Sequence, residues 1–322
     1  MFLPIGDFPN PKGYVAWVTW LLIAANVAVY LLISLPLTAL APDPADPALR
    51  AYVDAVAHQL PPGVTLQDFV RQLSAYDLFV FEHGFKPGAP AVDDLFASLF
   101  LHGGLGHLAG NMLFLWIYGD NVEHRLGRVP YLLAYLLTGV CATLAFAALD
   151  PGSMVPLVGA SGAISGVLGF YFLLFPRNVV KVFVALFPIL FRTIHVNARI
   201  VLGVFVVIDN LLPLLGGAGG GVAYGAHLGG FLAGLGLAWL GERAGWRRPG
   251  GEPRDDGAAA LRDARRGASP EQLARARLQM GLSLMQQGQP VAAYHHLVSA
   301  AELAPGTETA RQAEAALRAL TG

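Results

Sequence analysis

Charged residues are scarce in this chain. Asp, Glu, Lys and Arg make up 13% of its 322 residues, whereas about 25% is usual in a soluble domain. Apolar residues make up 55%, and the mean hydropathy is +0.52. This deficit of charge excludes an ordinary water-soluble domain, and it predicts that lipid surrounds much of the chain.

Two further shortages narrow the class of function. The net charge is only −1, which excludes a strongly basic nucleic-acid binder, so we expect no nucleic-acid partner. Cys141 is the only cysteine, so a disulfide framework is excluded. Because Cys141 lies within an apolar run, we interpret it as an inert core thiol.

Long apolar runs set the predicted architecture. Four runs contain no Asp, Glu, Lys or Arg, and they cover residues 14–40, 95–119, 129–149 and 152–176. Each is longer than the ~20 residues that carry a helix across ~30 Å of hydrocarbon. Two more apolar runs, at residues 198–215 and 222–240, bring the predicted number of spans to six. The predicted fold is therefore all-α, a polytopic six-transmembrane-helix bundle followed by a small cytoplasmic helical tail.

Two segments need a separate interpretation. Residues 179–191 are apolar, but Lys181 and Pro188 interrupt them, so we expect an interfacial or re-entrant segment rather than a seventh span. The first run ends in Ala39-Leu40-Ala41, which has the small residues of a signal-peptide cleavage site. That run is longer than the apolar core of a signal peptide, and Pro42 follows it directly. We therefore expect a retained helix.

Basic residues predict the orientation in the membrane. They gather in alternate loops at residues 125–128 and 177–192 and in the tail from Arg243, and the loops at 150–156 and 214–221 have none. The positive-inside rule then places both termini in the cytoplasm and residues 44–94 outside it. The chain is thus predicted to be an integral, multi-pass membrane protein. Its enrichment in Ala and Arg favours a bacterial inner membrane.

The composition changes near residue 246. We predict a membrane domain at 1–246, a linker rich in Arg, Asp and Gly at 247–269, and a helical tail at 270–322. Small and apolar residues of the tail fall at the positions of a 34-residue tetratricopeptide repeat: Gly281, Leu284, Ala293, Leu297, Ala300 and Pro305. One repeat and a following helix should leave this apolar strip partly uncovered. We therefore expect the tail to bind a cytoplasmic protein or to associate with itself.

Polar side chains within the apolar runs are functional hypotheses, because they are costly in lipid. They are His102, His107 and Asn111 in the second run, Ser161 in the fourth and His227 in the sixth. These three runs cross the membrane in the same direction, so their early residues reach one layer near the outer face. Ser161 and His227 are expected about five residues into their helices, roughly 8 Å deep.

The residue types predict nucleophilic catalysis. A serine hydroxyl such as that of Ser161 becomes a nucleophile when a histidine such as His227 takes its proton. The oxyanion that forms needs fixed hydrogen-bond donors. His107 and Asn111 are four residues apart and share a helix face, so they can supply an imidazole N–H and an amide NH₂ together.

Small residues surround the candidate nucleophile and predict close helix packing. They include Gly159 and Gly162 beside Ser161, and two small-xxx-small pairs, Gly162–Gly166 and Gly230–Gly234. Such spacing lets membrane helices approach closely. Because water is the second reactant of a hydrolase, a site near the outer surface is favoured over one at mid-membrane.

Three motifs together resemble the signatures of the rhomboid proteases, in the family's order and on the family's helices. They read His102-x4-His107-x3-Asn111, Gly159-Ala160-Ser161-Gly162 and Ala226-His227-x2-Gly230-x3-Gly234, and Gly119-x3-Glu123-x3-Gly127 also matches. The similarity covers residues 95–239. It implies an intramembrane serine endopeptidase that cleaves transmembrane-anchored protein substrates in contact with membrane lipid, without a metal or other cofactor.

The resemblance also implies roles for single residues. Ser161 would be the nucleophile and His227 the base of a dyad. His107, Asn111 and the backbone N–H of Ser161 would form the oxyanion hole. Structural residues near the site would be His102, Gly159 and Gly162. Glu123, at the inner end of the second run, would make structural hydrogen bonds.

This chain departs from the family pattern at two places. Many rhomboids carry Trp-Arg in the first outer loop, where this chain has Asp93-Asp94. Many also carry a tyrosine that stacks on the catalytic histidine, four residues after the nucleophile, where this chain has Ser165. Both departures concern lipid contacts and the packing of the base rather than the dyad itself.

Three residues have an alternative chemical role that their type allows. His102 and His107 could be zinc ligands, but a five-residue step on a helix turns them to different faces, and no carboxylate lies between them. Asp209 in the fifth run is a candidate third member of a triad. We favour a hydrated Asp209 near the outer interface, hydrogen-bonded to Asn210, because the family works as a dyad.

Two rival functions remain beside the protease. Inactive rhomboid relatives bind membrane clients without cutting them, but they usually lose the serine or the histidine, and this chain keeps both. A transporter would be expected to contain inverted repeats or paired broken helices, which the sequence does not suggest.

Overall fold

The computed structural model describes most of the chain. The described residues are 2–11, 13–57, 63, 65–186, 190–217, 222–245, 269–286 and 290–321. The structure is mostly helical (70%), and its strands form a small three-stranded sheet. The prediction of an all-α fold is therefore wrong for that sheet. The predicted linker at 247–269 lies outside the described residues, apart from Ser269.

The chain divides into two compact units, which are described separately. The bundle unit contains Val15–Pro176 and Arg199–Trp246. The sheet–tail unit contains Met1–Tyr14, Arg177–Ala198 and Arg247–Gly322. The sheet–tail unit thus joins the tail to two segments that the sequence placed in the membrane domain.

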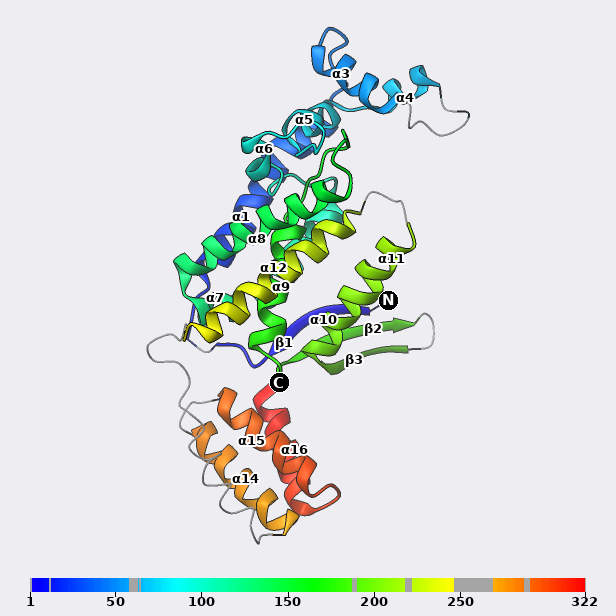
Figure 1. The fold of residues 1–322 in the computed structure, drawn as a ribbon. Helices are drawn as coiled ribbons and strands as arrows, with labels where there is room; N and C mark the ends of the chain where they lie inside the picture. The colour runs from blue at the N-terminus through cyan, green and yellow to red at the C-terminus, as the bar shows by residue number, and fades with distance from the viewer. Residues whose placement is uncertain are drawn as a thin grey trace. The chain divides into compact units, whose positions relative to one another are not determined.

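Helices of the bundle unit follow the predicted apolar runs (Figure 1). Among the described residues, four long helices are uninterrupted: α7 (Leu105–Leu126), α8 (Arg128–Leu149), α9 (Ser161–Leu174) and α12 (Tyr224–Arg243). Helix α1 (Trp17–Val29) continues through a π-helical turn, η1 (Tyr30–Ser34), into α2 (Leu35–Thr38). Helix α10 (Ala198–Val206) continues in the same way through η3 (Val207–Leu211) into α11 (Leu212–Leu215). The shorter helices α3 (Pro47–Val56), α4 (Leu66–Gln72), α5 (Ala75–His83) and α6 (Val92–Ala97) come between α2 and α7.

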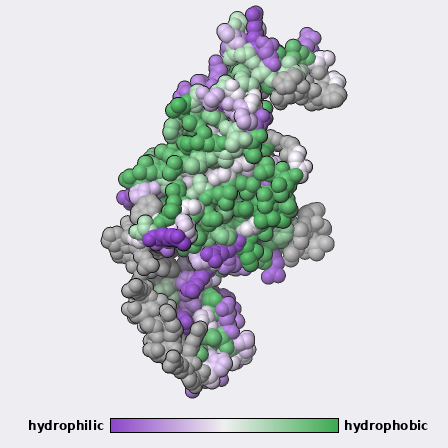
Figure 2. Space-filling model, in the orientation of Figure 1, coloured by the Kyte–Doolittle hydropathy of each residue, from purple (hydrophilic) through white to green (hydrophobic). Residues whose placement is uncertain are grey.

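The described part of the chain has three helices long and apolar enough to cross a membrane: Trp17–Thr38, Arg128–Leu149 and Ala198–Leu215. Large hydrophobic side chains on these helices face outward, and Figure 2 shows hydrophobic residues spread widely over the bundle unit. Among them, Leu32 is 76% exposed and Leu215 is 74% exposed. Outward apolar surface on this scale would be unfavourable in water and is suited to lipid.

Helix α9 is the most enclosed element of the bundle unit. It packs against α7, α8 and α12 (Figure 1), and its residues from Gly162 to Tyr171 are all buried. It has 14 residues, which corresponds to about 21 Å. The sequence placed a loop at 150–156 and Ser161 about five residues into its helix; this prediction is wrong for residues 157–160, because the helix begins only at Ser161.

The sheet corrects the interpretation of residues 179–191. Strands β1 (Phe2–Phe8), β2 (Val179–Leu186) and β3 (Leu190–Asn197) form an antiparallel sheet in the order β1-β2-β3. Every second residue of β2 is buried, namely Val180, Val182 and Val184. This two-residue alternation is the pattern of a half-buried strand. The prediction that this segment is not a seventh membrane helix is confirmed, whereas the strand itself was not predicted.

The tail forms three helices, α14 (Pro270–Gln286), α15 (Pro290–Leu303) and α16 (Glu308–Thr321). A side chain at Gly281 would clash with Leu297, so this glycine lets α14 and α15 cross closely. The predicted uncovered strip is wrong for Ala293, Leu297 and Ala300, which are fully buried because α14 and α16 cover α15, whereas Leu284 is only partly buried. The sheet also contacts the tail, where the rings of Phe8 and Tyr294 meet edge to face at 4.9 Å.

Glu123 provides the N-terminal cap of α1. The first turn of α1 has no capping side chain of its own. The buried Glu123 carboxyl group accepts hydrogen bonds from the backbone N–H of Thr19 at 2.7 Å, from the Thr19 hydroxyl at 2.8 Å and from the N–H of Val18 at 3.2 Å. Acceptors at this position satisfy donors that a helix leaves unpaired. The predicted structural role of Glu123 is confirmed.

Replacing Glu123 by alanine should therefore destabilise the bundle. One buried N–H donor, one partly buried N–H donor and a hydroxyl would lose the Glu123 acceptor, which should lower the free energy of unfolding by about 2–4 kcal/mol. Thermal unfolding in detergent micelles would measure the effect. Glu242→Ala is a matched control, because the ion pair that Glu242 makes with Arg125 is partly exposed and should contribute less than about 1 kcal/mol. Equal losses for the two variants would contradict the capping role.

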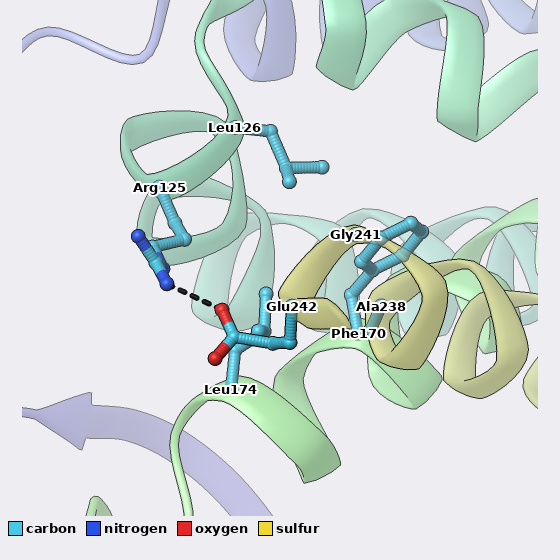
Figure 3. Close-up of a pocket in the computed structure, with 7 residues that line it drawn as sticks. All are labelled: Arg125, Leu126, Phe170, Leu174, Ala238, Gly241 and Glu242. Atoms are coloured by element: carbon cyan, nitrogen blue, oxygen red, sulfur yellow. Dashed lines mark hydrogen bonds and ion pairs between the residues drawn. The ribbon is translucent and has the colours of Figure 1, made fainter. Parts of the chain in front are cut away.

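The C-terminal ends of α7, α9 and α12 meet at a small pocket (Figure 3). Across it, Arg125 and Glu242 form an ion pair of 2.6 Å between α7 and α12. Apolar side chains, including Phe170 and Leu174, line the rest. Leu174 is the last residue of α9 and Ser161 the first, so this pocket lies about 20 Å along the helix from Ser161.

Candidate active site

Glycines bring α9 and α12 together at the candidate site. A side chain at Gly230 would clash with the backbone oxygen of Gly162, and one at Gly234 would clash with that of Gly166. The predicted close approach through small-xxx-small pairs is therefore confirmed. The two backbones touch at Gly162 and Gly230. The residue directly before Gly162 and the residue three positions before Gly230 therefore lie close to each other.

Those residues are Ser161 and His227, and they form a hydrogen bond. Ser161 Oγ lies 2.8 Å from His227 Nε2. Ser161 is the first residue of α9, and His227 is the fourth of α12. The prediction that each lies about five residues into its helix is therefore wrong for Ser161. The geometry lets the imidazole accept the serine proton.

The segment before Ser161 is held in place by backbone contacts with the region between α5 and α7. Phe85 and Leu157 exchange two backbone hydrogen bonds of 3.1 and 2.8 Å. The N–H of Gly159 donates to the carbonyl oxygen of Ser98 at 2.8 Å. These bonds use the backbone groups of this apolar segment in an extended pairing, which explains why the helix starts only at Ser161.

Gly159 allows His107 to reach the nucleophile. Its φ of +123° is in the region that favours glycine. A Cβ atom there would lie 2.9 Å from His107 Nε2 and 3.6 Å from Ser161 Oγ, so the imidazole nitrogen and the hydroxyl border the same small space. His107 and Asn111 are on one helix, α7. The side-chain nitrogen of Asn111 is buried without a hydrogen-bond partner, which leaves a donor available.

His102 lies in the turn before α7 rather than within a helix. It is fully buried, and its ring meets that of His107 edge to face at 5.2 Å. The Tyr76 hydroxyl donates to the carbonyl oxygen of His102 at 2.8 Å and accepts from its N–H at 3.1 Å. The prediction that His102 and His107 lie on different faces of one helix is wrong, because His102 is not helical. The observed contacts place His102 as a neighbour that packs against His107.

Asn210 was missed by the sequence analysis. Its side-chain Oδ1 lies 2.7 Å from His227 Nδ1, on the opposite side of the imidazole from Ser161. Asn210 comes from the π-helical turn η3 and is 1% exposed. A polar residue in the fifth apolar run was the available signal. Asp209, the carboxylate weighed as a third member, is exposed.

Asp94, at one of the two places where the chain departs from the family pattern, forms a buried ion pair. Asp94 is buried and lies 3.4 Å from the ammonium group of Lys86, which is also buried. Lys86 Nζ also donates to the carbonyl oxygens of Phe81, Glu82 and Gly84 at the end of α5. The lysine therefore joins α5 to α6 immediately after Phe85, the residue that pairs with the segment leading to Ser161.

Comparison with known proteins shows what the central region is similar to. Residues 91–244 match the family described as Rhomboid domain. The chain is 31% identical over 193 residues to Rhomboid-like protein 11, chloroplastic, of Arabidopsis thaliana, which covers 55% of this chain and 61% of that protein.

Two further relatives match shorter regions. Rhomboid protease GluP of Bacillus subtilis (strain 168) is 43% identical over 75 residues, or 23% of this chain and 14% of that protein. Presenilin-associated rhomboid-like protein, mitochondrial, of Bos taurus is 30% identical over 152 residues, or 47% of this chain and 38% of that protein. The chain spans less than two thirds of the length of each of these relatives. Residues 91–244 are thus similar to a rhomboid domain, and the relatives that the chain resembles are named rhomboid or rhomboid-like proteins.

Proposed function

We propose that the chain is an intramembrane serine endopeptidase that cleaves transmembrane-anchored protein substrates. The observation that carries the proposal is the 2.8 Å hydrogen bond between Ser161 Oγ and His227 Nε2. It lies in the region similar to a rhomboid domain, whose helices present apolar surface outward. A nucleophile paired with a base in such a setting is suited to acyl transfer on a peptide bond near lipid.

In the proposed reaction, Ser161 Oγ attacks the carbonyl carbon of the scissile peptide bond while His227 Nε2 takes the hydroxyl proton. The carbonyl oxygen becomes an oxyanion, which accepts hydrogen bonds from His107, Asn111 and the N–H of Ser161. His227 then gives its proton to the leaving amine, and an acyl-enzyme remains. Water, deprotonated by the same imidazole, attacks the acyl carbon and releases Ser161.

We also propose the membrane arrangement. The six helical segments α1–α2, α7, α8, α9, α10–α11 and α12 would each cross the bilayer, with both termini in the cytoplasm. The support is the distribution of basic residues in the sequence. Ser161 and His227 would then lie toward the outer side. A bacterial inner membrane is the proposed location.

A client-binding protein without protease activity is the alternative, because some relatives are named rhomboid-like rather than protease. The paired serine and histidine favour the protease, since binding alone does not require a nucleophile aligned with a base. Reconstitution in liposomes with a single-span test substrate would separate the two functions. The proposal expects two fragments from the anchored substrate and slower cleavage of the same sequence without its anchor. A substrate that is bound but stays intact would favour the client-binding alternative.

The tail is proposed to act independently of catalysis, as a tetratricopeptide-like module that binds a cytoplasmic protein or a second copy. The name of one relative, presenilin-associated, links that relative to another protein. All the site residues are in the bundle unit, whereas residues 270–322 are in the sheet–tail unit. Deleting residues 247–322 should therefore leave kcat within about twofold of that of the full chain, and it should change the complex size on native gels. A folded but inactive truncation would contradict this.

A further inference from the structure

We propose that Asn210 is a positioning residue that holds His227 in the tautomer and orientation needed to deprotonate Ser161. The inference rests on the proposed function and adds a third member to the pair. Asn210 Oδ1 and Ser161 Oγ lie at opposite nitrogens of the imidazole, at 2.7 and 2.8 Å. The three side chains come from separate elements, η3, α12 and α9.

The orientation of the Asn210 amide is fixed by its other contact. Its Nδ2 donates to the backbone carbonyl oxygen of Phe205 at 2.7 Å. If the amide were turned over, Oδ1 would face that carbonyl oxygen, and two acceptors would repel each other. The nitrogen must therefore face Phe205, and Oδ1 must face His227.

This orientation determines where the proton sits on His227. An amide oxygen can only accept a hydrogen bond, so the 2.7 Å contact requires the proton of the neutral imidazole on Nδ1. The other nitrogen, Nε2, is then free to accept the proton of Ser161 Oγ. After transfer, Asn210 Oδ1 still accepts from Nδ1 of the imidazolium. Asn210 thus favours the one neutral tautomer that can act as a base.

The place of Asn210 in η3 explains why this residue, and not its neighbour, reaches the base. Asn210 is almost completely buried, whereas Asp209 is exposed. Phe205, which precedes η3, lies with its ring 6.4 Å from that of His227. Ser165, at the position where many rhomboids stack a tyrosine on the base, is buried and small. The α10–η3 segment therefore supplies both a ring and a hydrogen bond to His227.

The test compares three variants of the full chain in cleavage of a single-span substrate. Asn210→Leu keeps the size of the side chain but removes the acceptor, and it should lower kcat by about 10²-fold with KM within about twofold. Asn210→Asp keeps an acceptor for Nδ1 but loses the donor to the carbonyl oxygen of Phe205, so it should recover only part of the rate, about three- to tenfold over the leucine variant. Asp209→Asn is the matched control on the exposed neighbour and should cleave at the wild-type rate.

A double mutant separates positioning from a purely structural role. If Asn210 acts through His227, adding Asn210→Leu to His227→Ala should change the residual rate by less than about twofold. A leucine variant with unchanged kcat, an aspartate variant no better than leucine, or an additive loss in the double mutant would each overturn the inference while leaving the protease proposal intact. A wild-type protein that does not cleave would overturn both.

Discussion

Replacing Ser161 by alanine is expected to lower kcat for cleavage by at least about 10⁴-fold, and replacing His227 by alanine should have a similar effect. The reason is that the attacking oxygen and its base act as one unit, joined in the structure by a 2.8 Å hydrogen bond. Without the serine hydroxyl there is no nucleophile for the histidine to deprotonate, and without the histidine the hydroxyl has no base. The double variant should therefore be no slower than either single variant.

The measurement is single-turnover cleavage in detergent or liposomes, together with thermal unfolding to show that each variant is folded. Ser165→Ala provides a matched control, because Ser165 is a buried serine one turn further along α9. This control should retain activity within about threefold. Normal cleavage by Ser161→Ala would exclude the proposed nucleophile, and losses that add in the double variant would contradict a joint role.

Replacing His107 or Asn111 by alanine is expected to lower kcat by roughly 10²–10³ for each lost donor, with a smaller change in KM. The oxyanion exists only after attack, so donors to it stabilise the transition state more than the bound substrate. His107 borders the same space as Ser161 Oγ, and the amide nitrogen of Asn111 is buried and unpaired. Both features fit donors that are held ready for an oxygen.

A control on the same helix tests whether these losses are specific. His124 is an exposed residue near the C-terminal end of α7, so His124→Ala should leave kcat within about twofold. Steady-state kinetics with a fluorogenic single-span substrate would separate kcat from KM. A His107 or Asn111 variant with normal kcat would remove that residue from the proposed oxyanion hole.

The sequence predicted the pairing of Ser161 with His227 from the residue types, from the direction of the apolar runs and from the resemblance of the motifs. Gly162 and Gly230 permit close backbone contact, and their neighbours in the chain are then fixed in space. The same kind of reasoning failed for Asn210. A π-helical turn shifts the residues that follow it relative to a regular helix, so the sequence alone could not tell whether Asp209 or Asn210 would face the base.

Two misjudged segments have a common cause. A lack of charge indicates an apolar environment but does not distinguish helix, strand and extended loop. Residues 157–160 were assigned to a helix, although Leu157 and Gly159 pair with Phe85 and Ser98. Residues 179–191 were assigned to an interfacial segment, although the alternation at Val180, Val182 and Val184 indicates a strand. The hydrogen-bond partners of Leu157 and Gly159 are distant in sequence, and so is β1, one of the two strands that pair with β2.

The most direct test of the central claim is mass spectrometry of a single-span substrate after incubation with the purified chain in liposomes. We predict that the wild-type protein produces two fragments cut at one peptide bond near the outer end of the substrate's membrane span, and that Ser161→Ala at the same density produces neither. Intact substrate with the wild-type protein, or the same two fragments with Ser161→Ala, would contradict a protease built on Ser161 and His227.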